Sequence, residues 1–264
     1  MLKMTERVIW KAVVGAALAG LFAAGCGAAR THGVARTHGV AAARVTLERS
    51  CPAGRHRPLG SSDASYAAAL VSPAAAYRVP GGARIARFGL RNANGVSTVF
   101  GVVGEELDAR CDARWLHVML PMRPNGLTGW VRASRVELLR VHTRIVVDLS
   151  ERRLRFYRRG RLVLSSIAAV GSSATPTPLG RYYVNQRLIP GDPGGPFGPG
   201  AVGISAFSPV LTGWTQGGPI AIHGTNEPWS IGRAVSNGCI RLPNATLRKL
   251  FAQTPSGTPV LIRR

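Results

Sequence analysis

Acidic residues are scarce in this chain of 264 residues, which carries 12 Asp and Glu against 34 Lys and Arg. The formal net charge of +22 favours an anionic partner, such as a membrane face or an anionic polymer. The basic residues are spread along the chain, and no RRM or zinc-finger fingerprint is present. We therefore expect no nucleic acid among the partners, but the charge alone does not choose the partner, and a general arginine enrichment explains it equally well.

Metal ligands and carboxylates are especially scarce after Arg159. This part of the chain holds one cysteine (Cys239), one histidine (His223) and two acids (Asp192 and Glu227). A zinc site normally needs three or four His, Cys or carboxylate ligands, and a glycosidase needs two positioned carboxylates. Because Asp192 lies in a Pro/Gly-rich loop and neither acid has an apolar setting, we expect no metal, no cofactor and no glycosidase chemistry.

The apolar run near the N-terminus, residues 12–24, is too short for a comfortable membrane span of about 20 residues. Lys3, Arg7 and Lys11 precede this run and small residues follow it, a pattern typical of a secretion signal. The segment "FAAGC" also resembles a bacterial lipobox, in which Cys26 becomes the lipidated first residue of the mature protein. An ordinary cleaved signal or an uncleaved anchor fits the same pattern, and all three interpretations export the chain.

Cysteines are also few, at positions 26, 51, 111 and 239. Export permits disulfides, because these bonds persist outside the cytoplasm. If Cys26 carries lipid, Cys51 and Cys111 can pair, which leaves Cys239 as an odd thiol that needs an explanation. Pairing of Cys239 with Cys51 or Cys111 stays open at the level of sequence.

The composition divides the chain into a leader, a linker and two β-rich parts. Residues 1–26 form the signal or lipoprotein segment, and residues 27–64, with "ARTHGV" in tandem, form a low-complexity linker. Residues 65–140 show short strands and Pro/Gly/Asn turns with no helix of normal length, which predicts a small all-β barrel. Residues 141–264 continue in strands, with a Gly/Pro-rich loop and one short helix over residues 245–251 capped by Asn244.

The segment "VSNGCIRLPN" places Cys239 in a stretch rich in turn formers. A free thiol has a pKa of about 8.5 and attacks as the thiolate, so it needs a base, and His223 is available. Arg241 faces the same way as Cys239 in an extended segment and adds positive charge. Gly238 allows close approach of a substrate carbonyl, and the N–H groups of Gly238 and Cys239 can form an oxyanion hole. A backbone carbonyl, with that of Gly224 as the candidate, would orient the imidazole.

The wider segment "AIHGTNEPWSIGRAVSNGCIRL" resembles the signature of the L,D-transpeptidase catalytic domain. That signature has His-Gly and, after a gap, Ser/Thr-x-Gly-Cys followed by an apolar residue and often Arg. The segments "TPTPLGRYYV", "GPFGPGAVGISAFS" and "GTPVLIRR" are similar to other parts of the family. Asn237 stands where many relatives have a histidine, which leaves the base assignment to His223 intact. The segment "LPMRPNGLTGWV" resembles the bacterial SH3-like domains that precede cell-wall enzymes.

These resemblances imply a mainly β fold, with a small SH3-like barrel followed by an L,D-transpeptidase β-sandwich with a short helix. By resemblance, Cys239 attacks the diaminopimelate carbonyl of a peptidoglycan tetrapeptide stem, and His223 serves as base and then as acid. D-alanine leaves, and the amine of a second stem resolves the thioester. The residues expected around the oxyanion and the substrate are Ser236, Asn237, Gly238 and Arg241.

The same resemblance implies the partners, and the N-terminal segment predicts the location. Peptidoglycan stem peptides and anionic wall polymers are the expected partners, with the membrane reached only through an N-terminal anchor. The expected location is the cell envelope, as a membrane-anchored lipoprotein or as a protein secreted to the wall. A same-fold L,D-carboxypeptidase that trims stems and a non-catalytic wall-binding lipoprotein remain as alternatives.

Overall fold

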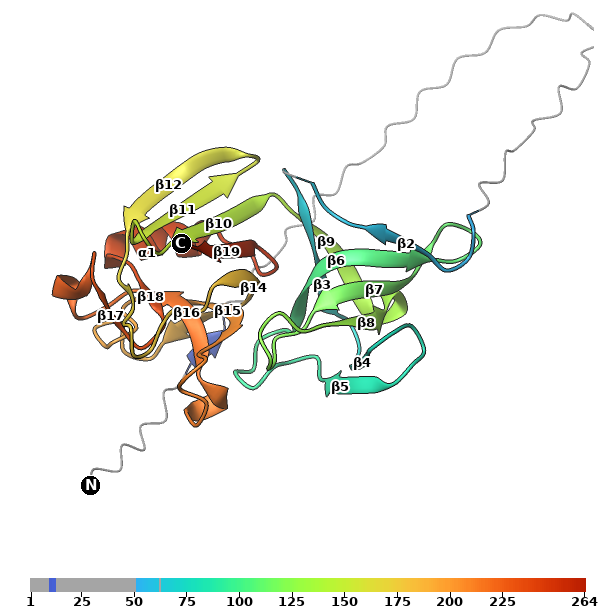
Figure 1. The fold of residues 1–264 in the computed structure, drawn as a ribbon, viewed down its shortest axis with the longest axis horizontal. Helices are drawn as coiled ribbons and strands as arrows, with labels where there is room; N and C mark the ends of the chain where they lie inside the picture. The colour runs from blue at the N-terminus through green and yellow to red at the C-terminus, as the bar shows by residue number, and fades with distance from the viewer. Residues whose placement is uncertain (1–9, 13–50, 62) are drawn as a thin grey trace, which may run out of the picture.

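Two β-sheets account for most of the chain that the structure describes, which comprises residues 10–12, 51–61 and 63–264 (Figure 1). This computed structural model is mainly β with one short α-helix, which confirms the predicted fold class at that level. The expected lipidation site Cys26, the tandem repeat and most of the leader lie outside the described residues. None of the helices in the described ranges has the length and apolar character needed to cross a membrane.

The N-terminal sheet contains strands β2 to β9 in the order β5-β4-β8-β7-β6-β3-β9, with β2 paired to β6. Its core holds Phe100, Leu116 and Val131, each almost fully buried. The bounds are β2 Arg55–Pro58, β3 Ser65–Leu70, β4 Ala74–Tyr77, β5 Arg84–Phe88, β6 Val99–Leu107, β7 Ala113–Met119, β8 Thr128–Arg132 and β9 Val136–Val141, with the 3-10 helix η1 at Ala133–Arg135.

The C-terminal sheet runs in the order β12-β11-β10-β19-β14-β15-β16-β18, and the short strand β1 pairs with β14. Strands β13 and β17 form a separate parallel pair. The strand bounds are β1 Trp10–Ala12, β10 Thr143–Asp148, β11 Arg153–Arg158, β12 Arg161–Ile167, β13 Val170–Gly171, β14 Gly180–Pro190, β15 Ala201–Phe207, β16 Pro219–His223, β17 Ala234–Ser236, β18 Ile240–Arg241 and β19 Pro259–Arg263. The helices are η2 Thr215–Gly217, η3 Pro228–Ser230 and α1 Asn244–Gln253.

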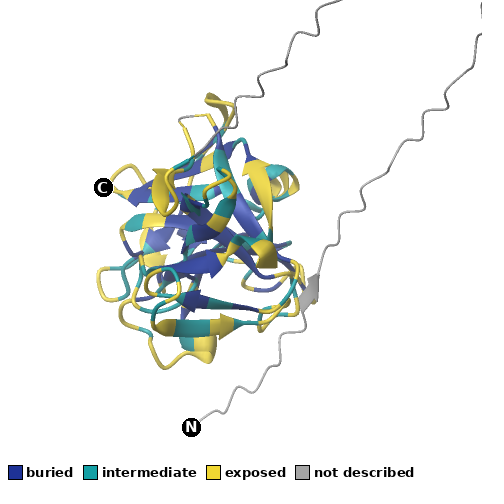
Figure 2. Ribbon diagram, turned by 90° about the vertical axis from the view of Figure 1, so that its right-hand side faces the viewer, coloured by how far each residue is buried: buried dark blue, intermediate teal, exposed yellow. Residues whose placement is uncertain are grey.

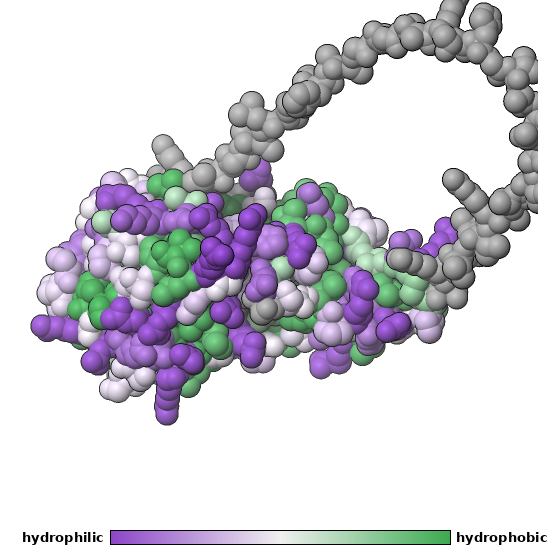
Figure 3. Space-filling model, turned by 90° about the horizontal axis from the view of Figure 1, so that it is seen from above, coloured by the Kyte–Doolittle hydropathy of each residue, from purple (hydrophilic) through white to green (hydrophobic). Residues whose placement is uncertain are grey.

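Helix α1 buries Leu247 and Leu250 in the core of the C-terminal sheet, next to Ile222 and Ile240. The two leucines are three residues apart and therefore share one face of the helix. Figure 2 shows buried residues inside both sheets and exposed residues on the connecting loops. The face of the molecule drawn in Figure 3 carries hydrophilic side chains scattered between smaller apolar patches. This scatter agrees with the even spread of basic residues along the sequence.

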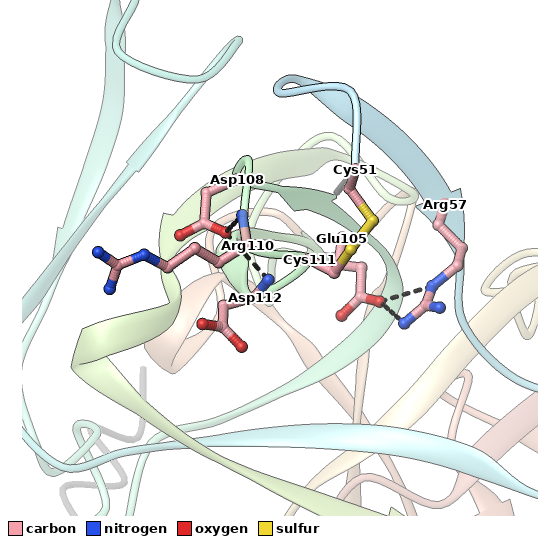
Figure 4. Close-up of a disulfide and its surroundings, with 7 residues drawn as sticks. All are labelled: Cys51, Arg57, Glu105, Asp108, Arg110, Cys111 and Asp112. Carbon is pink, nitrogen blue, oxygen red and sulfur yellow. Dashed lines mark hydrogen bonds and ion pairs between the residues drawn. A yellow bond between two sulfur atoms is a disulfide. The ribbon is translucent and has the colours of Figure 1, made fainter. Parts of the chain in front are cut away.

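The predicted linker ends earlier than residue 64. Residues 55–58 form β2, which pairs with β6, and the Arg57 side chain makes an ion pair with Glu105. Cys51 and Cys111 are joined by a disulfide, with Cα atoms 5.1 Å apart (Figure 4). Residues 51–61 therefore belong to the N-terminal sheet. The low-complexity composition did not predict the pairing of β2 with β6, because the partners of these residues lie about 50 positions further along the chain.

The two sheets pack directly against each other. A Cβ at Gly101 of β6 would lie 2.9 Å from the ring of Tyr183 of β14, so only glycine fits that contact. A Cβ at Gly257, which precedes β19, would lie 2.2 Å from Cβ of Ala67 of β3. Because both contacts join buried residues from different sheets, the N-terminal sheet is held close to the C-terminal one.

Candidate active site

Strands β16 and β18 bring Cys239 and His223 to one place. The two strands pair in parallel, with Ile222 opposite Ile240 and His223 opposite Arg241. The backbone N–H of Ala221 donates to Sγ of Cys239 at 3.4 Å. Because side chains two residues apart on a strand share a face, His223 lies on the same face as Ala221 and Cys239. The fully buried Ile222 and Ile240 fix this register from the opposite face.

His223 is buried, and its Nδ1 lies 2.5 Å from the carbonyl oxygen of Gly224. A carbonyl only accepts hydrogen bonds, so Nδ1 carries the proton and the lone pair is on Nε2. The ring of Phe197 meets the imidazole edge-on at a centroid distance of 5.0 Å. Burial, with a smaller effect of the positive charge of Arg241, lowers the pKa of His223 to about 4. His223 is therefore a neutral base at physiological pH, in the tautomer that accepts a proton at Nε2.

Cys239 is a free thiol and is partly exposed. Burial raises its pKa, while the Ala221 N–H and the positive charge of Arg241 oppose this rise. The thiol therefore rests in its protonated form beside an unprotonated imidazole. This arrangement suits proton transfer during attack and disfavours a preformed thiolate–imidazolium pair.

The turn before Cys239 is held by hydroxyl groups. Ser236 Oγ donates to the carbonyl of Cys239 at 2.6 Å and accepts the N–H of Gly238 at 3.2 Å. Gly238 has a φ of +107°, which an L side chain rarely adopts. Ser236 thus shapes the turn.

The same turn changes the expected oxyanion hole. Because the Gly238 N–H donates to Ser236 Oγ, it is not free for a substrate oxygen. No hydrogen bond to the Cys239 N–H is found within the described ranges, so this donor is free. Asn237 is exposed at the tip of the turn. We therefore assign the Cys239 N–H, and not that of Gly238, as the available oxyanion donor.

Two threonines that the sequence analysis did not single out support this turn from the segment before β14. Thr177 Oγ1 donates to the Gly238 carbonyl at 2.8 Å, and Thr175 Oγ1 donates to the Ser236 carbonyl at 3.0 Å. Thr177 also accepts the N–H of Gly171. The "TPTP" run resembles a segment of the family, but its contacts could not be predicted because they join residues about 60 positions apart.

Arg241 forms an ion pair with Glu227 beside the site, and its side chain is mostly buried. Its positive charge lowers the pKa of both His223 and Cys239. The sequence could have predicted Glu227 as the partner of Arg241. Acids are scarce in this region, and Glu227 is the nearest one to Arg241 in the sequence. The ion pair therefore ties Arg241 to the loop that carries Glu227.

Asn244 does not cap α1 as predicted. Pro243 occupies the N-cap position, and no side chain caps the helix. Instead, Asn244 Oδ1 accepts the N–H of Thr225 at 2.8 Å, and Nδ2 donates to the Thr225 carbonyl at 3.0 Å. Asn244 thus fixes the loop that carries the Gly224 carbonyl. The side-chain amide of an asparagine can either cap a helix or bind the backbone of a loop. The sequence favoured the cap, because the helix N-terminus is adjacent in the chain and Thr225 is not.

No cluster of three His, Cys, Asp or Glu side chains suited to a metal ion occurs in the part of the chain that the structure describes. Cys51 and Cys111 form their disulfide in the N-terminal sheet, while Cys239 is unbonded in the C-terminal one. The site is thus a thiol with an oriented neutral imidazole, a free backbone donor and a nearby positive charge. These are the parts needed for acyl transfer through a thioester.

Residues 142–262 match the YkuD family, described as the L,D-transpeptidase catalytic domain. This match confirms the family predicted from the sequence for that region. The chain is 44% identical over 119 residues to the putative L,D-transpeptidase YkuD of Bacillus licheniformis, covering 45% of this chain and 64% of the relative. It is 38% identical over 120 residues to the protein of the same name in Bacillus subtilis, covering 46% of this chain and 65% of the relative. The chain thus spans slightly less than two thirds of each relative.

Proposed function

We propose that this protein is an L,D-transpeptidase that cross-links peptidoglycan stems through a Cys239 thioester. The observation that carries the proposal is the strand pairing that places the Cys239 thiol next to the strand of His223, whose tautomer is set by the Gly224 carbonyl. The match of residues 142–262 to the L,D-transpeptidase catalytic domain supports the choice of substrate.

In the first half-reaction, Cys239 Sγ attacks the diaminopimelate carbonyl of a tetrapeptide stem while its proton passes to Nε2 of His223. The Cys239 N–H donates to the developing oxyanion. His223 returns the proton to the D-alanine nitrogen, the amide C–N bond breaks, and a thioester remains. Because neither group is charged at rest, proton transfer accompanies attack.

In the second half-reaction, the side-chain amine of another stem attacks the thioester. The new amide bond forms, the C–S bond breaks, and His223 carries the amine proton to Sγ, which restores the thiol. If water attacks instead, the enzyme is a carboxypeptidase that releases a tripeptide stem. The partial exposure of Cys239 leaves room for either acceptor.

A carbapenem and intact-protein mass spectrometry test the nucleophile. We expect one covalent adduct on the soluble form, no adduct on Cys239→Ala and strongly slowed formation on His223→Asn. His142→Asn, a matched change outside the site, should react like the wild type. An adduct that persists in Cys239→Ala, or none on folded and reduced wild type, would sink the proposal.

Purified tetrapeptide stems then separate the acceptors. Cross-linked dimers with release of D-alanine are expected from a transpeptidase. Tripeptide monomers as the only product would identify the carboxypeptidase, and unchanged stems bound to the protein would identify a non-catalytic wall-binding protein.

We also propose that the chain is exported, with residues 65–140 as an SH3-like barrel that binds wall material and residues 141–264 as the catalytic β-sandwich. The basic and apolar leader supports export, and the Cys51–Cys111 bond supports an oxidising compartment. The net charge of +22 supports anionic wall polymers as partners. Lipidation at Cys26 predicts that labelled fatty acid enters the wild type but not Cys26→Ser, and equal labelling would exclude it.

A further inference from the structure

We propose that Arg123 and Asn125, in the connection between β7 and β8, are positioning residues for Cys239 and His223. They hold both ends of the connection between β15 and β16, residues 208–218, which is called the 208–218 loop below. The inference rests on the proposed function for its catalytic readout. With this role, the N-terminal sheet contributes to the geometry of the active site and is not only a neighbouring module.

Arg123 bridges the base of the 208–218 loop. Its Nη2 donates to the carbonyl of Ser208, where the loop begins, and at 2.8 Å to the carbonyl of Gly217, where it ends. The guanidinium also lies over the ring of Phe207, 5.5 Å from its centroid. One side chain from the N-terminal sheet therefore fixes the separation of the two ends of the loop.

Asn125 pairs with the last residue of β15 as a neighbouring strand would. Its Nδ2 donates to the Phe207 carbonyl at 2.8 Å, and its Oδ1 accepts the Phe207 N–H at 2.9 Å. Because Phe207 lies opposite Pro219, the first residue of β16, this pair also holds the point at which β16 starts.

A second connection of the N-terminal sheet holds the loop near its far end. Gln216 has a φ of +58°, which is costly for a residue other than glycine and persists only when the surroundings fix it. Its side-chain amide exchanges hydrogen bonds with that of Asn94, at 2.8 Å from Gln216 Nε2 to Asn94 Oδ1. The loop is thus held at three places by the other sheet.

The 208–218 loop leads directly into the catalytic strand. Ile220, two residues past the loop, lies so close to Gly238 that a Cβ there would be 3.0 Å from its Cδ1. Ala221 follows and donates its N–H to Sγ of Cys239, and His223 comes two residues later. Any movement of the loop's end is therefore passed on to the contacts of the thiol.

The chemistry of Arg123 agrees with a positioning role. In the described ranges it has no carboxylate partner, and its hydrogen bonds go to backbone carbonyls alone. Its buried Nε has no hydrogen-bond partner there either. A cation without a counter-charge adds little to stability by ion pairing, but it holds two carbonyls in fixed geometry.

The test compares Arg123→Gln and Asn125→Ala with Arg135→Gln in the full chain. Arg135 also donates a guanidinium hydrogen bond, to Ser72 Oγ, but within its own sheet and away from the 208–218 loop. We expect carbapenem acylation to fall about ten- to a hundredfold in the first two variants, as for a small misplacement of reacting groups, and to stay unchanged in the control. Arg123→Lys should recover part of the rate, because an ammonium still reaches a carbonyl.

A second readout separates positioning from stability. The rate of iodoacetamide labelling of Cys239, measured against pH, should rise at a higher pH in Arg123→Gln than in the wild type. The reason is that a weaker hydrogen bond from the Ala221 N–H stabilises the thiolate less. A merely structural role would lower the melting temperature and leave the pH profile of folded protein unmoved, which would overturn the proposal.

The outcomes distinguish the two proposals. Variants that acylate within twofold of an active wild type overturn the positioning role and leave the transpeptidase in place. A wild type without any adduct, whose labelling profile still shifts in Arg123→Gln, overturns the proposed function and supports the positioning role. If Arg123→Gln fails to fold, Asn125→Ala and Arg123→Lys decide the question by the same two measurements.

Discussion

Cys239 and His223 meet as neutral groups, and this sets the course of the reaction at the scale of single residues. The pKa of His223 is lowered to about 4, whereas the pKa of Cys239 is raised by burial. In the proposed reaction a thiolate therefore forms only as the substrate carbonyl is attacked, with the imidazole taking the proton. The hydrogen bond from Nδ1 to Gly224 contributes by keeping Nε2 ready for that proton.

The low pKa of His223 predicts an unusual pH profile. Acylation by a carbapenem should stay near its full rate from pH 8 down to about pH 5 and fall with a midpoint near pH 4, because the base stays unprotonated until then. Initial rates between pH 3.5 and 8, followed by mass spectrometry, measure the profile. His142→Asn should keep it. A midpoint near 6.5, the ordinary value for histidine, would show that the imidazole is not held in this buried, neutral state.

The same shift predicts a loss of stability in mild acid. Between pH 6.5 and about 4 the unfolded chain binds a proton at His223 that the folded chain does not, so stability falls as pH falls through this window. The shift corresponds to about 3 kcal/mol at most, from 1.36 kcal/mol per pKa unit. Urea unfolding at pH 7 and pH 4.5 should show this dependence, reduced in His223→Asn and retained in His142→Asn. An equal pH dependence of the unfolding free energy in both variants would show that groups other than His223 cause it.

At the scale of elements, α1 contributes to the site through its first residue. Asn244 holds both backbone groups of Thr225, and Thr225 follows the carbonyl that orients His223. The helix is anchored in turn by Leu247 and Leu250, both fully buried. The imidazole is thus oriented by a chain of contacts that ends in the hydrophobic core.

Asn244→Ala should weaken both the fold and the reaction. Removing one partner of a buried hydrogen-bonded pair costs about 1–3 kcal/mol, which urea unfolding measures. Carbapenem acylation should also fall, because the Gly224 carbonyl is no longer fixed. Asn226→Ala, which changes an exposed neighbour, serves as the control. Unfolding and acylation equal to that control would show that the Thr225 loop keeps its position without Asn244.

The sequence predicted the parts of the site that depend on residue identity. The scarcity of other reactive groups left Cys239 and His223, and the lack of an Asp close in the sequence suggested the Gly224 carbonyl. It did not predict Thr177, Asn125 or the loop role of Asn244. Each of these acts through a hydrogen bond to a backbone group that tertiary packing brings near, and no periodicity records such a contact. The β-rich fold was predictable because alternation and turn residues are local signals.

At the scale of the whole molecule, the N-terminal sheet is fastened to the C-terminal one. Close contacts at Gly101 and Gly257 bring the sheets together, and Arg123 joins the 208–218 loop to the N-terminal sheet. The sequence predicted two β-rich parts in series, without a reason for them to act together. Their packing gives that reason, since β16 starts where both sheets meet.

The Cys51–Cys111 bond should stabilise the N-terminal sheet through the unfolded chain. It closes a loop over a sequence separation of 60 residues, for which the chain-entropy model gives about 4 kcal/mol. Denaturant unfolding of the Cys51→Ser, Cys111→Ser double variant should show a loss of this order. Cys239→Ala, which removes a thiol but no bond, should unfold like the wild type.

Alkylation checks the bond itself. Under denaturing conditions the wild type should gain two further labels after reduction, because Cys51 and Cys111 then become free. The same mass with and without reductant would exclude the disulfide. If the bond is present but the double variant unfolds at the wild-type denaturant concentration, then the pairing of β2 with β6 and the ion pair of Arg57 with Glu105 suffice to hold residues 51–61 in place.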